Sequence, residues 1–322
     1  MKKVIIIFLL LSLGFTAAAQ VEKLIVPSDL KQQTIVTEPI TLRKGYLRAG
    51  TALSFFALDK YFVTATQKEY YPLSSWHTDF SYQLTLRYGV TDRFEVDCAI
   101  PLKSERTRLL YYITWPGLNS NVSLSGDLKG KGLSDCELTL KYQLIPEKEN
   151  KISLAAWQWL TFPTGQKNYT DIKSFTDFNL PVGDGAFSTG TELTARRIKY
   201  PYSYSVYASY TINFQGSKLI SQDDKTETKF RDGDYLMLDA DFSIHLNEWI
   251  ALSNELNYKY DQKGIIKYTV SQVKNPGWAF SYQPGLYFQI RRFRIAEAVQ
   301  VPLMGKNTSA DPLYVMMVVY TF

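Results

Sequence analysis

Long stretches of this chain alternate strictly between polar and apolar side chains, and this pattern limits the folds that are open to it. The cleanest stretches are 79–88, 137–144 and 202–214. An amphipathic helix repeats its apolar residues about every 3.6 positions, so a sustained period of two predicts β-strands with one apolar face. A soluble β-sandwich also alternates, but it turns its polar faces outward and rarely carries so many long strands. The chain is therefore expected to be all-β.

The connections between the strands say which β fold to expect. Alternation predicts about twelve strands, at 45–63, 76–88, 93–102, 134–145, 151–163, 187–198, 202–214, 234–246, 249–260, 277–290, 293–302 and 313–322. Tight links at 89–92, 146–150, 199–201, 247–248 and 291–292 take turns with long polar links at 64–75, 103–133, 164–186, 215–233, 261–276 and 304–312. Outer-membrane barrels alternate short periplasmic turns with long extracellular loops in this way. The sequence thus predicts a transmembrane, antiparallel, up-and-down β-barrel.

Both ends of the chain fit an exported barrel in the bacterial outer membrane. The two lysines at positions 2 and 3, the apolar run 4–13 and the alanines 17–19 have the pattern of a secretory signal peptide, too short to be a spanning helix. The last strand carries a large apolar residue at every second position and ends on an aromatic one: Tyr314, Met316, Val318, Tyr320 and Phe322. This ending resembles the signal read by the barrel-assembly machinery, which is the expected partner besides membrane lipid. The predicted parts are a signal peptide (1–19), a periplasmic tail or lumen plug (20–44) and the barrel (45–322).

Composition narrows the function classes. Aromatic residues make up 15% of the chain, including 23 Tyr and 18 Phe, which suits aromatic girdles at the two membrane interfaces. The net charge of +5 is mixed and unclustered, so no nucleic-acid partner is expected. Phosphate-binding glycine loops, nucleophile elbows and zinc-type Cys/His spacings do not occur in the sequence. Neither a cofactor nor a metal is expected.

Several short motifs point to a family. They lie at 37–45, 86–95 with Pro101, 132–142, 162–165 and 183–190. Together they resemble the outer-membrane transporter family named "MetA-pathway of phenol degradation", over residues 37–322. The motifs are mostly turn signals, among them a Gly-x-x-Asp strand start (132–135) and a Pro-Thr-Gly strand exit (163–165), and glycine suits a re-entering loop because it permits positive φ. The resemblance implies a transporter barrel, and the family name implies aromatic hydrocarbons.

If the apolar face of each strand meets lipid, the charged residues of the other face line the lumen. These candidates are Arg48, Asp79, Arg87, Glu95, Asp97, Glu137, Lys141, Glu192, Arg196, Asp239, Asp241, Glu255 and Lys259. They could form a constriction that selects solutes, or a salt-bridge mesh that fills a narrow lumen. A twelve-stranded barrel favours the mesh for most of them, because the interior widens with strand number.

The alternation also predicts which side chains of one strand meet lipid. On the strand 202–214, Val206, Ala208, Tyr210 and Ile212 should face outward, and Ser205, Tyr207, Ser209 and Thr211 inward. Cys98 and Cys136 fall on adjacent strands with an expected offset of about four residues, or about 13 Å. A disulfide does not span that distance.

A catalytic function is not expected. A serine hydrolase would need a Ser, a His and an orienting polar residue, and 243, 245 and 247 offer Ser, His and Asn. These residues fall on the lumenal face near a periplasmic turn, whereas a lipase must face lipid. The sequence therefore favours a passive channel for small solutes, hydrophobic or aromatic ones included. The alternative is a structural or surface-interaction barrel with a closed lumen, whose loops 103–133 and 164–186 contact partners.

Overall fold

A computed structural model of the chain describes residues 41–322, apart from 71–75, 115–120, 148–150, 169, 175–176, 219–227, 248, 268–270 and 291. In these ranges no helix is long and apolar enough to cross a bilayer. The predicted signal peptide and most of the predicted tail, residues 1–40, lie outside the described part.

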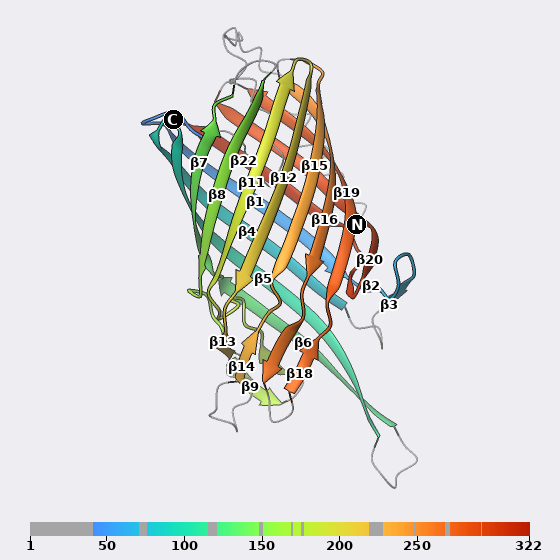
Figure 1. The fold of residues 1–322 in the computed structure, drawn as a ribbon. Helices are drawn as coiled ribbons and strands as arrows, with labels where there is room; N and C mark the ends of the chain where they lie inside the picture. Colours follow the sequence, from blue (N-terminus) through green and yellow to red (C-terminus); the bar gives the residue numbers. More distant parts are fainter. Residues whose placement is uncertain are drawn as a thin grey trace.

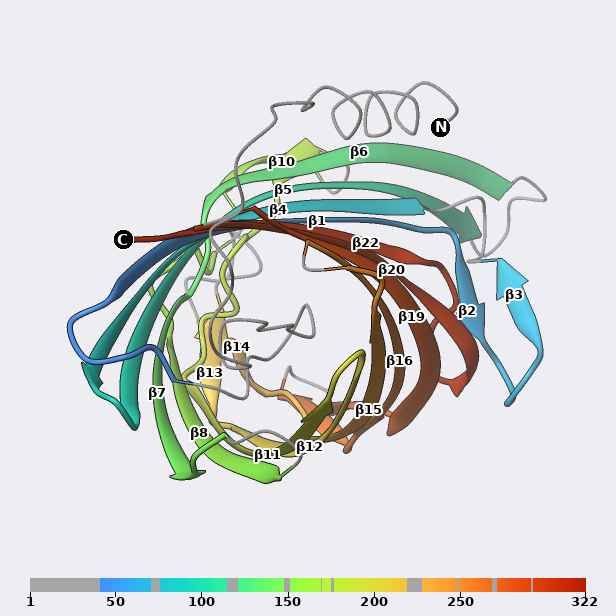
Figure 2. The same ribbon diagram turned by 90° about the horizontal axis from the view of Figure 1, so that it is seen from above.

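The described strands form one closed antiparallel barrel of 12 strands, which confirms the predicted fold (Figure 1). Its members in chain order are β1 (Leu47–Leu58), β4 (Trp76–Thr91), β5 (Phe94–Thr114), β7 (Cys136–Ile145), β8 (Ile152–Phe162), β11 (Ser188–Lys199), β12 (Tyr202–Asn213), β15 (Tyr235–His245), β16 (Ile250–Asp261), β19 (Gly277–Ile290), β20 (Phe293–Lys306) and β22 (Leu313–Thr321). Each pairs with its neighbours along the chain, and β1 pairs with β22 to close the ring (Figure 2). The tight turns and the C-terminus lie at the top of Figure 1, which is the periplasmic end; the long links lie at the bottom.

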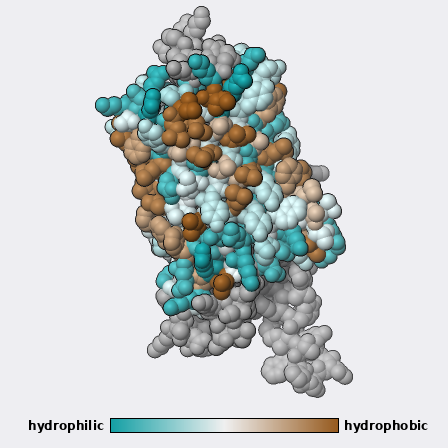
Figure 3. Space-filling view, viewed as in Figure 1, coloured by the Kyte–Doolittle hydropathy of each residue, from teal (hydrophilic) through white to brown (hydrophobic). Residues whose placement is uncertain are grey.

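The alternation of side chains separates a lipid-facing surface from an interior. On β12 each predicted outward residue is exposed and each predicted inward one is buried, which confirms that prediction; Val206 is 55% exposed and Ser205 only 6%. Apolar residues gather over the strand wall and hydrophilic ones toward the two ends (Figure 3). Because the outer surface meets hydrocarbon rather than water, exposed apolar side chains stabilise the barrel in place.

Aromatic side chains mark both ends of the wall. At the periplasmic end the rings of Phe293 and Tyr320 lie 4.7 Å apart. At the extracellular end Phe187 contacts Phe162 and Phe214, with ring centroids 5.8 and 5.4 Å apart. Aromatic rings at two such levels are typical of barrels anchored at both membrane interfaces.

The segment 103–133, predicted to be a loop, is mostly strand. β5 continues to Thr114 and pairs with β6 (Asn121–Leu133), so that a two-stranded ribbon projects from the extracellular end (Figure 1). The loop prediction was wrong because a ribbon beyond the membrane is wet on both faces. It therefore lacks the alternation that marks a strand in the wall.

Two small sheets complete the extracellular end. The predicted first strand divides into β1 and β2 (Lys60–Phe62), which pairs with β3 (Lys68–Tyr70) and β21 (Thr308–Ser309) beside the barrel. A four-stranded sheet has the order β13 (Gly216–Lys218), β14 (Thr228–Arg231), β17 (Gly264–Lys267), β18 (Ser271–Lys274). β10 (Asp177–Asn179) extends the ribbon by pairing with β6, and β9 (Thr170–Ser174) pairs in turn with β10. Seen down the axis, β13 and β14 lie within the outline of the ring (Figure 2).

The register corrects the predicted position of the cysteines. Cys98 lies opposite Leu138, so Cys136 is two residues away rather than four. Such diagonal neighbours are about 7–8 Å apart, which is close to the limit for a disulfide. Both cysteines are free in the structure.

Candidate transport path

The inner face of β11, β12, β15 and β16 is polar and densely filled. Its carboxylates include Glu192, Asp239, Asp241 and Glu255, all of them buried. Since an isolated carboxylate is costly to bury, each must find hydrogen-bond donors or cations nearby.

The donors come from the neighbouring strands. Asp241 accepts hydrogen bonds from the hydroxyls of Ser253 and, at 2.8 Å, Ser243. Glu255 accepts from the hydroxyl of Tyr207 and from the side-chain amide of Gln283 at 3.0 Å. These bonds join β12, β15, β16 and β19 into one network, which we call the polar mesh. The sequence favoured a mesh of salt bridges for most of the charged residues, whereas Asp241 and Glu255 are held here by neutral donors.

Cations complete the mesh at its borders. Arg196 pairs with Glu147 (3.3 Å) through side chains that are 2% and 5% exposed. The ammonium group of Lys141 lies 4.1 Å from the ring centre of Trp157, an arrangement that stabilises a cation away from water. Glu147 was missed from the sequence because it belongs to a predicted turn.

The opposite inner wall, on β20, β22 and β1, is apolar. On β22, Thr321 points inward and accepts a hydrogen bond from the side chain of Arg48 (2.9 Å). Because side chains alternate across a strand, Val319, Met317 and Val315 point inward as well. On β1 the register places Gly50 beside Val319 and Ala52 beside Met317. On β20 it places Ala296 beside Met317 and Ala298 beside Val315, whereas Arg294 is the neighbour of Val319. We call this surface the apolar strip: Gly50, Ala52, Ala296, Ala298, Val315, Met317 and Val319. It rises through three cross-strand levels, each about 6.6 Å from the next.

The two walls differ in access from the lumen. Inward residues of β12, β15 and β16 are buried except near the extracellular end, whereas many of those on β22, β1 and β4 are only half-buried. The half-buried set consists of Ala52, Ser54, Phe56, Ser81, Gln83, Thr85, Val315 and Met317. Because these side chains point inward, the space that reaches them lies inside the barrel. The accessible interior is thus off-centre, against β22, β1 and β4.

Residues just before β1 enter the periplasmic end. The backbone N–H of Leu42 donates to the carboxylate of Glu95 (2.6 Å), and the hydroxyl of Thr41 donates to the carbonyl of Asp92 (3.0 Å). Leu42 is 4% exposed. Glu95, predicted as a lumen residue, therefore anchors the segment that leads into the first strand.

The predicted lumen residues fall into two groups by exposure. Buried in the interior are Arg48, Asp79, Glu95, Lys141, Glu192, Arg196, Asp239, Asp241 and Glu255. Partly exposed are Arg87, Asp97, Glu137 and Lys259. Arg87 pairs with Asp97 at 2.8 Å, and the Lys259 side chain, 44% exposed, pairs with Asp261 at 3.0 Å.

Further inward charges of the described strands lie outside the predicted set. Lys103 contacts Asp79 (3.6 Å) and Glu105 (3.3 Å) where β5 rises toward the extracellular end. Lys103 and Glu105 were missed because the predicted strand stopped at residue 102. Arg294, buried on β20, could have been found by alternation from Phe293.

The serine–histidine pair has no catalytic arrangement. The Ser243 hydroxyl donates its hydrogen to Asp241, so His245 does not receive it as a general base would. Both residues are buried. Among the described residues no group of three His, Cys, Asp or Glu is placed to hold a metal ion.

No family model matches the chain, and no curated protein matches its sequence. Its structure is similar to that of an outer membrane channel from Pseudomonas putida F1, with a TM-score of 0.66, 12% identity and coverage of 88% of this chain and 98% of that one. Weaker likenesses are the toluene transporter of Ralstonia pickettii (TM-score 0.44, 10% identity, 89% and 93% coverage) and the β domain of a Bordetella autotransporter (0.47, 8%, 86% and 99%). At such identities the likeness shows the fold alone. The chain is a β-barrel of the kind found in the bacterial outer membrane, and that is its location.

Proposed function

We propose that this protein is a passive channel for small solutes and that it favours solutes with an apolar surface, aromatic ones included. The observation that carries the proposal is the position of the accessible interior. It lies along Ala52, Val315 and Met317 of the apolar strip and the neutral polar side chains of β4, not along the polar mesh. The resemblance to a family named for phenol degradation agrees with this solute class.

The wall chemistry explains how such a solute would pass. An apolar face that displaces water from Met317 or Val315 gains hydrophobic stabilisation. A polar edge of the same solute meets Ser54, Ser81 or Gln83 on the adjoining strands. Because the strip offers similar contacts over several levels, a solute exchanges one set of contacts for the next without being trapped in a deep free-energy minimum. Passage then follows the concentration gradient.

The competing function is a surface-interaction barrel with a closed lumen. The projecting β5–β6 ribbon favours it, because a ribbon of this length extends well beyond what a channel wall requires (Figure 1). Planar-bilayer conductance and liposome swelling with aromatic and sugar solutes separate the two. A folded protein that neither conducts nor admits any solute, both unmodified and as Asp135→Asn, would establish the closed barrel.

A matched pair of variants tests the solute class. Met317 and Gln83 lie at the same level on either side of Ala52, and both are half-buried. Met317→Lys adds a charge and removes apolar surface, whereas Gln83→Lys adds the same charge at the same depth. Met317→Lys should reduce aromatic permeation far more than Gln83→Lys, with similar effects of both on ion conductance. Equal losses of aromatic permeation would show that charge alone matters and that the strip does not select.

A further inference from the structure

Three motifs that are distant in the sequence meet at the extracellular rim. The carboxylate of Asp135, from the Gly-x-x-Asp motif, accepts the backbone N–H of Gly165 (2.8 Å) and of Asp184 (2.6 Å). Gly165 ends the Pro-Thr-Gly motif after β8, and Asp184 belongs to the glycine-rich motif before β11. One buried side chain thus holds two separate backbone segments.

Neighbouring residues strengthen this junction. The hydroxyl of Ser134 donates to the carbonyl of Val182 (2.6 Å), and the N–H of Cys136 donates to the hydroxyl of Thr164 (2.9 Å). Hydrogen bonds to an ionised carboxylate are stronger than neutral ones, so Asp135 is the central member. We call Ser134, Asp135 and Gly165 the clamp.

The motif glycines are required by close backbone contact. A Cβ on Gly165 would lie 2.9 Å from the Cα of Gly183, and a Cβ on Gly183 would lie 2.8 Å from the carboxylate of Asp135. Gly132 has a φ of 156°, as predicted for the glycine of the strand start. A side chain at 165 or 183 would therefore push apart the two segments that the clamp joins.

The clamp holds residues 177–187, here called the strap, which lead from β10 into β11. Its first part is fixed to the ribbon, where Leu180 N–H donates to the carbonyl of Lys129 (2.9 Å). Further along, Gly185 lies against the backbone of Gly216 and Ser217 of β13, the strand that follows β12. β7, β8 and β11 lie between β5 and β12 in the ring. The strap thus runs from the ribbon to β13 at the extracellular end, past the ends of these three strands.

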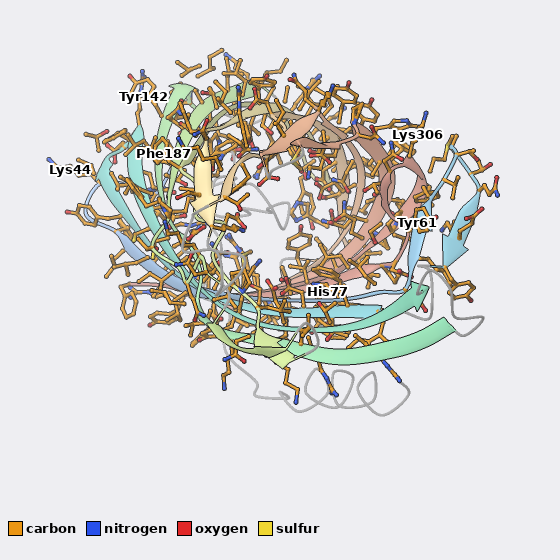
Figure 4. The ribbon with its side chains drawn as sticks, turned by 90° about the horizontal axis from the view of Figure 1, so that it is seen from below. Lys44, Tyr61, His77, Tyr142, Phe187 and Lys306 are labelled. Carbon is orange, nitrogen blue, oxygen red and sulfur yellow. The ribbon has the colours of Figure 1, made fainter. Side chains whose placement is uncertain are left out.

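The strap also contacts the small sheet beside it. Gly185 packs against Lys167 and Ser217, and the Lys167 ammonium lies 3.3 Å from the Ser217 hydroxyl of β13. Seen from the extracellular side, the ring is bordered by this sheet near Phe187, where the strap ends (Figure 4). Clamp, strap and sheet form one connected structure on the mouth.

We propose that the clamp is the latch of an extracellular gate: while Asp135 holds the strap, the mouth is narrowed, and release of the strap opens it. This inference rests on the proposed channel function. The latch consists of a few hydrogen bonds rather than a large apolar interface, so it can open without unfolding the barrel. Solutes enter when the strap moves away from the ribbon and β13.

The test compares two aspartates with the same chemistry. Asp135→Asn removes one acceptor oxygen, and with it at least one charge-assisted hydrogen bond. Asp311→Asn is the control, because the Asp311 carboxylate accepts the N–H of Asp59 (2.9 Å) and of Lys60 (2.8 Å) beside the barrel. Asp135→Asn should raise the open probability in single-channel recordings by about tenfold. Asp311→Asn should leave it unchanged.

Limited trypsin digestion reports release of the clamp independently, through cleavage at Lys167, which packs against Gly185 of the strap. Faster cleavage together with more opening in Asp135→Asn supports the gate. Faster cleavage with unchanged conductance, or no change in either readout, overturns it. If Asp135→Asn conducts while the unmodified protein is silent, the gate is supported as one that is shut at rest. If neither protein conducts, the channel function itself fails. Heat-modifiable gel mobility verifies that each variant is folded.

Discussion

A single charge placed on the lipid face should destabilise the barrel by a predictable amount. Ala208 lies in the middle of β12 and points outward. Its cross-strand neighbours are Leu193 and Leu238, which are 52% and 43% exposed to what is hydrocarbon in the membrane. Ala208→Arg would therefore place a guanidinium among apolar side chains and lipid tails.

The magnitude follows from the depth of the site. A cationic side chain near the midplane of a barrel costs about 2–4 kcal/mol. A urea slope of about 2 kcal/mol per molar converts this into a fall of the unfolding midpoint by about 1–2 M. Tryptophan fluorescence in lipid vesicles, followed as a function of urea, measures that midpoint.

Two inward variants serve as controls. Gln83→Arg introduces the same group on the accessible inner wall, where water reaches it, and should cost much less. Ser209→Arg shifts the charge by one residue to face Glu192 and should also be milder than Ala208→Arg, although the mesh leaves it little room. If Ala208→Arg proves no more damaging than Gln83→Arg, the assignment of lipid and lumen faces is refuted.

Three further predictions concern other parts of the chain. Deleting Phe322 or replacing it by Asp should impair insertion by the barrel-assembly machinery, seen as loss of the heat-modifiable band in outer-membrane fractions; normal insertion would contradict the terminal signal. Arg196→Met should destabilise the barrel by about 3–5 kcal/mol because it leaves Glu147 buried without its ion pair, and adding Glu147→Gln should restore part of the loss in urea unfolding; no recovery would argue against the pair. Cys98 and Cys136 should stay reduced in the purified protein, and an intact bridge in its mass spectrum would mean that their diagonal spacing is shorter than the register implies.

The wall of the barrel could be predicted from the sequence because successive side chains of a strand point to opposite faces. Shifting a strand by one residue exchanges its two faces, so an alternation as clear as that of β12 leaves one arrangement. The same alternation predicted that Asp241 and Glu255 point inward, without any knowledge of their hydrogen-bond partners. Outside the membrane the two faces of a strand are not distinguished, and there the β5–β6 ribbon escaped prediction.

The apolar strip and the clamp were not predicted, for different reasons. On β22 both faces are apolar, Val315 and Met317 inside as well as Tyr314 and Met316 outside. Alternation of polarity cannot reveal an inner face of that kind. The clamp joins residues 30 and 49 positions apart, and single-sequence patterns carry no information on such tertiary contacts. Each motif therefore looked like an isolated turn signal around Asp135.

The uneven interior has a mechanical consequence. Side-chain hydrogen bonds such as those of Asp241 and Glu255 tie β12, β15, β16 and β19 together in addition to their backbone ladders. That half of the cylinder should resist bending, so thermal deformation concentrates in the half where the first and last strands meet. The lumen would then change its cross-section mainly by movement of β22 and β1, and amide exchange should be fastest there. The seam that closes the barrel is also its most compliant wall.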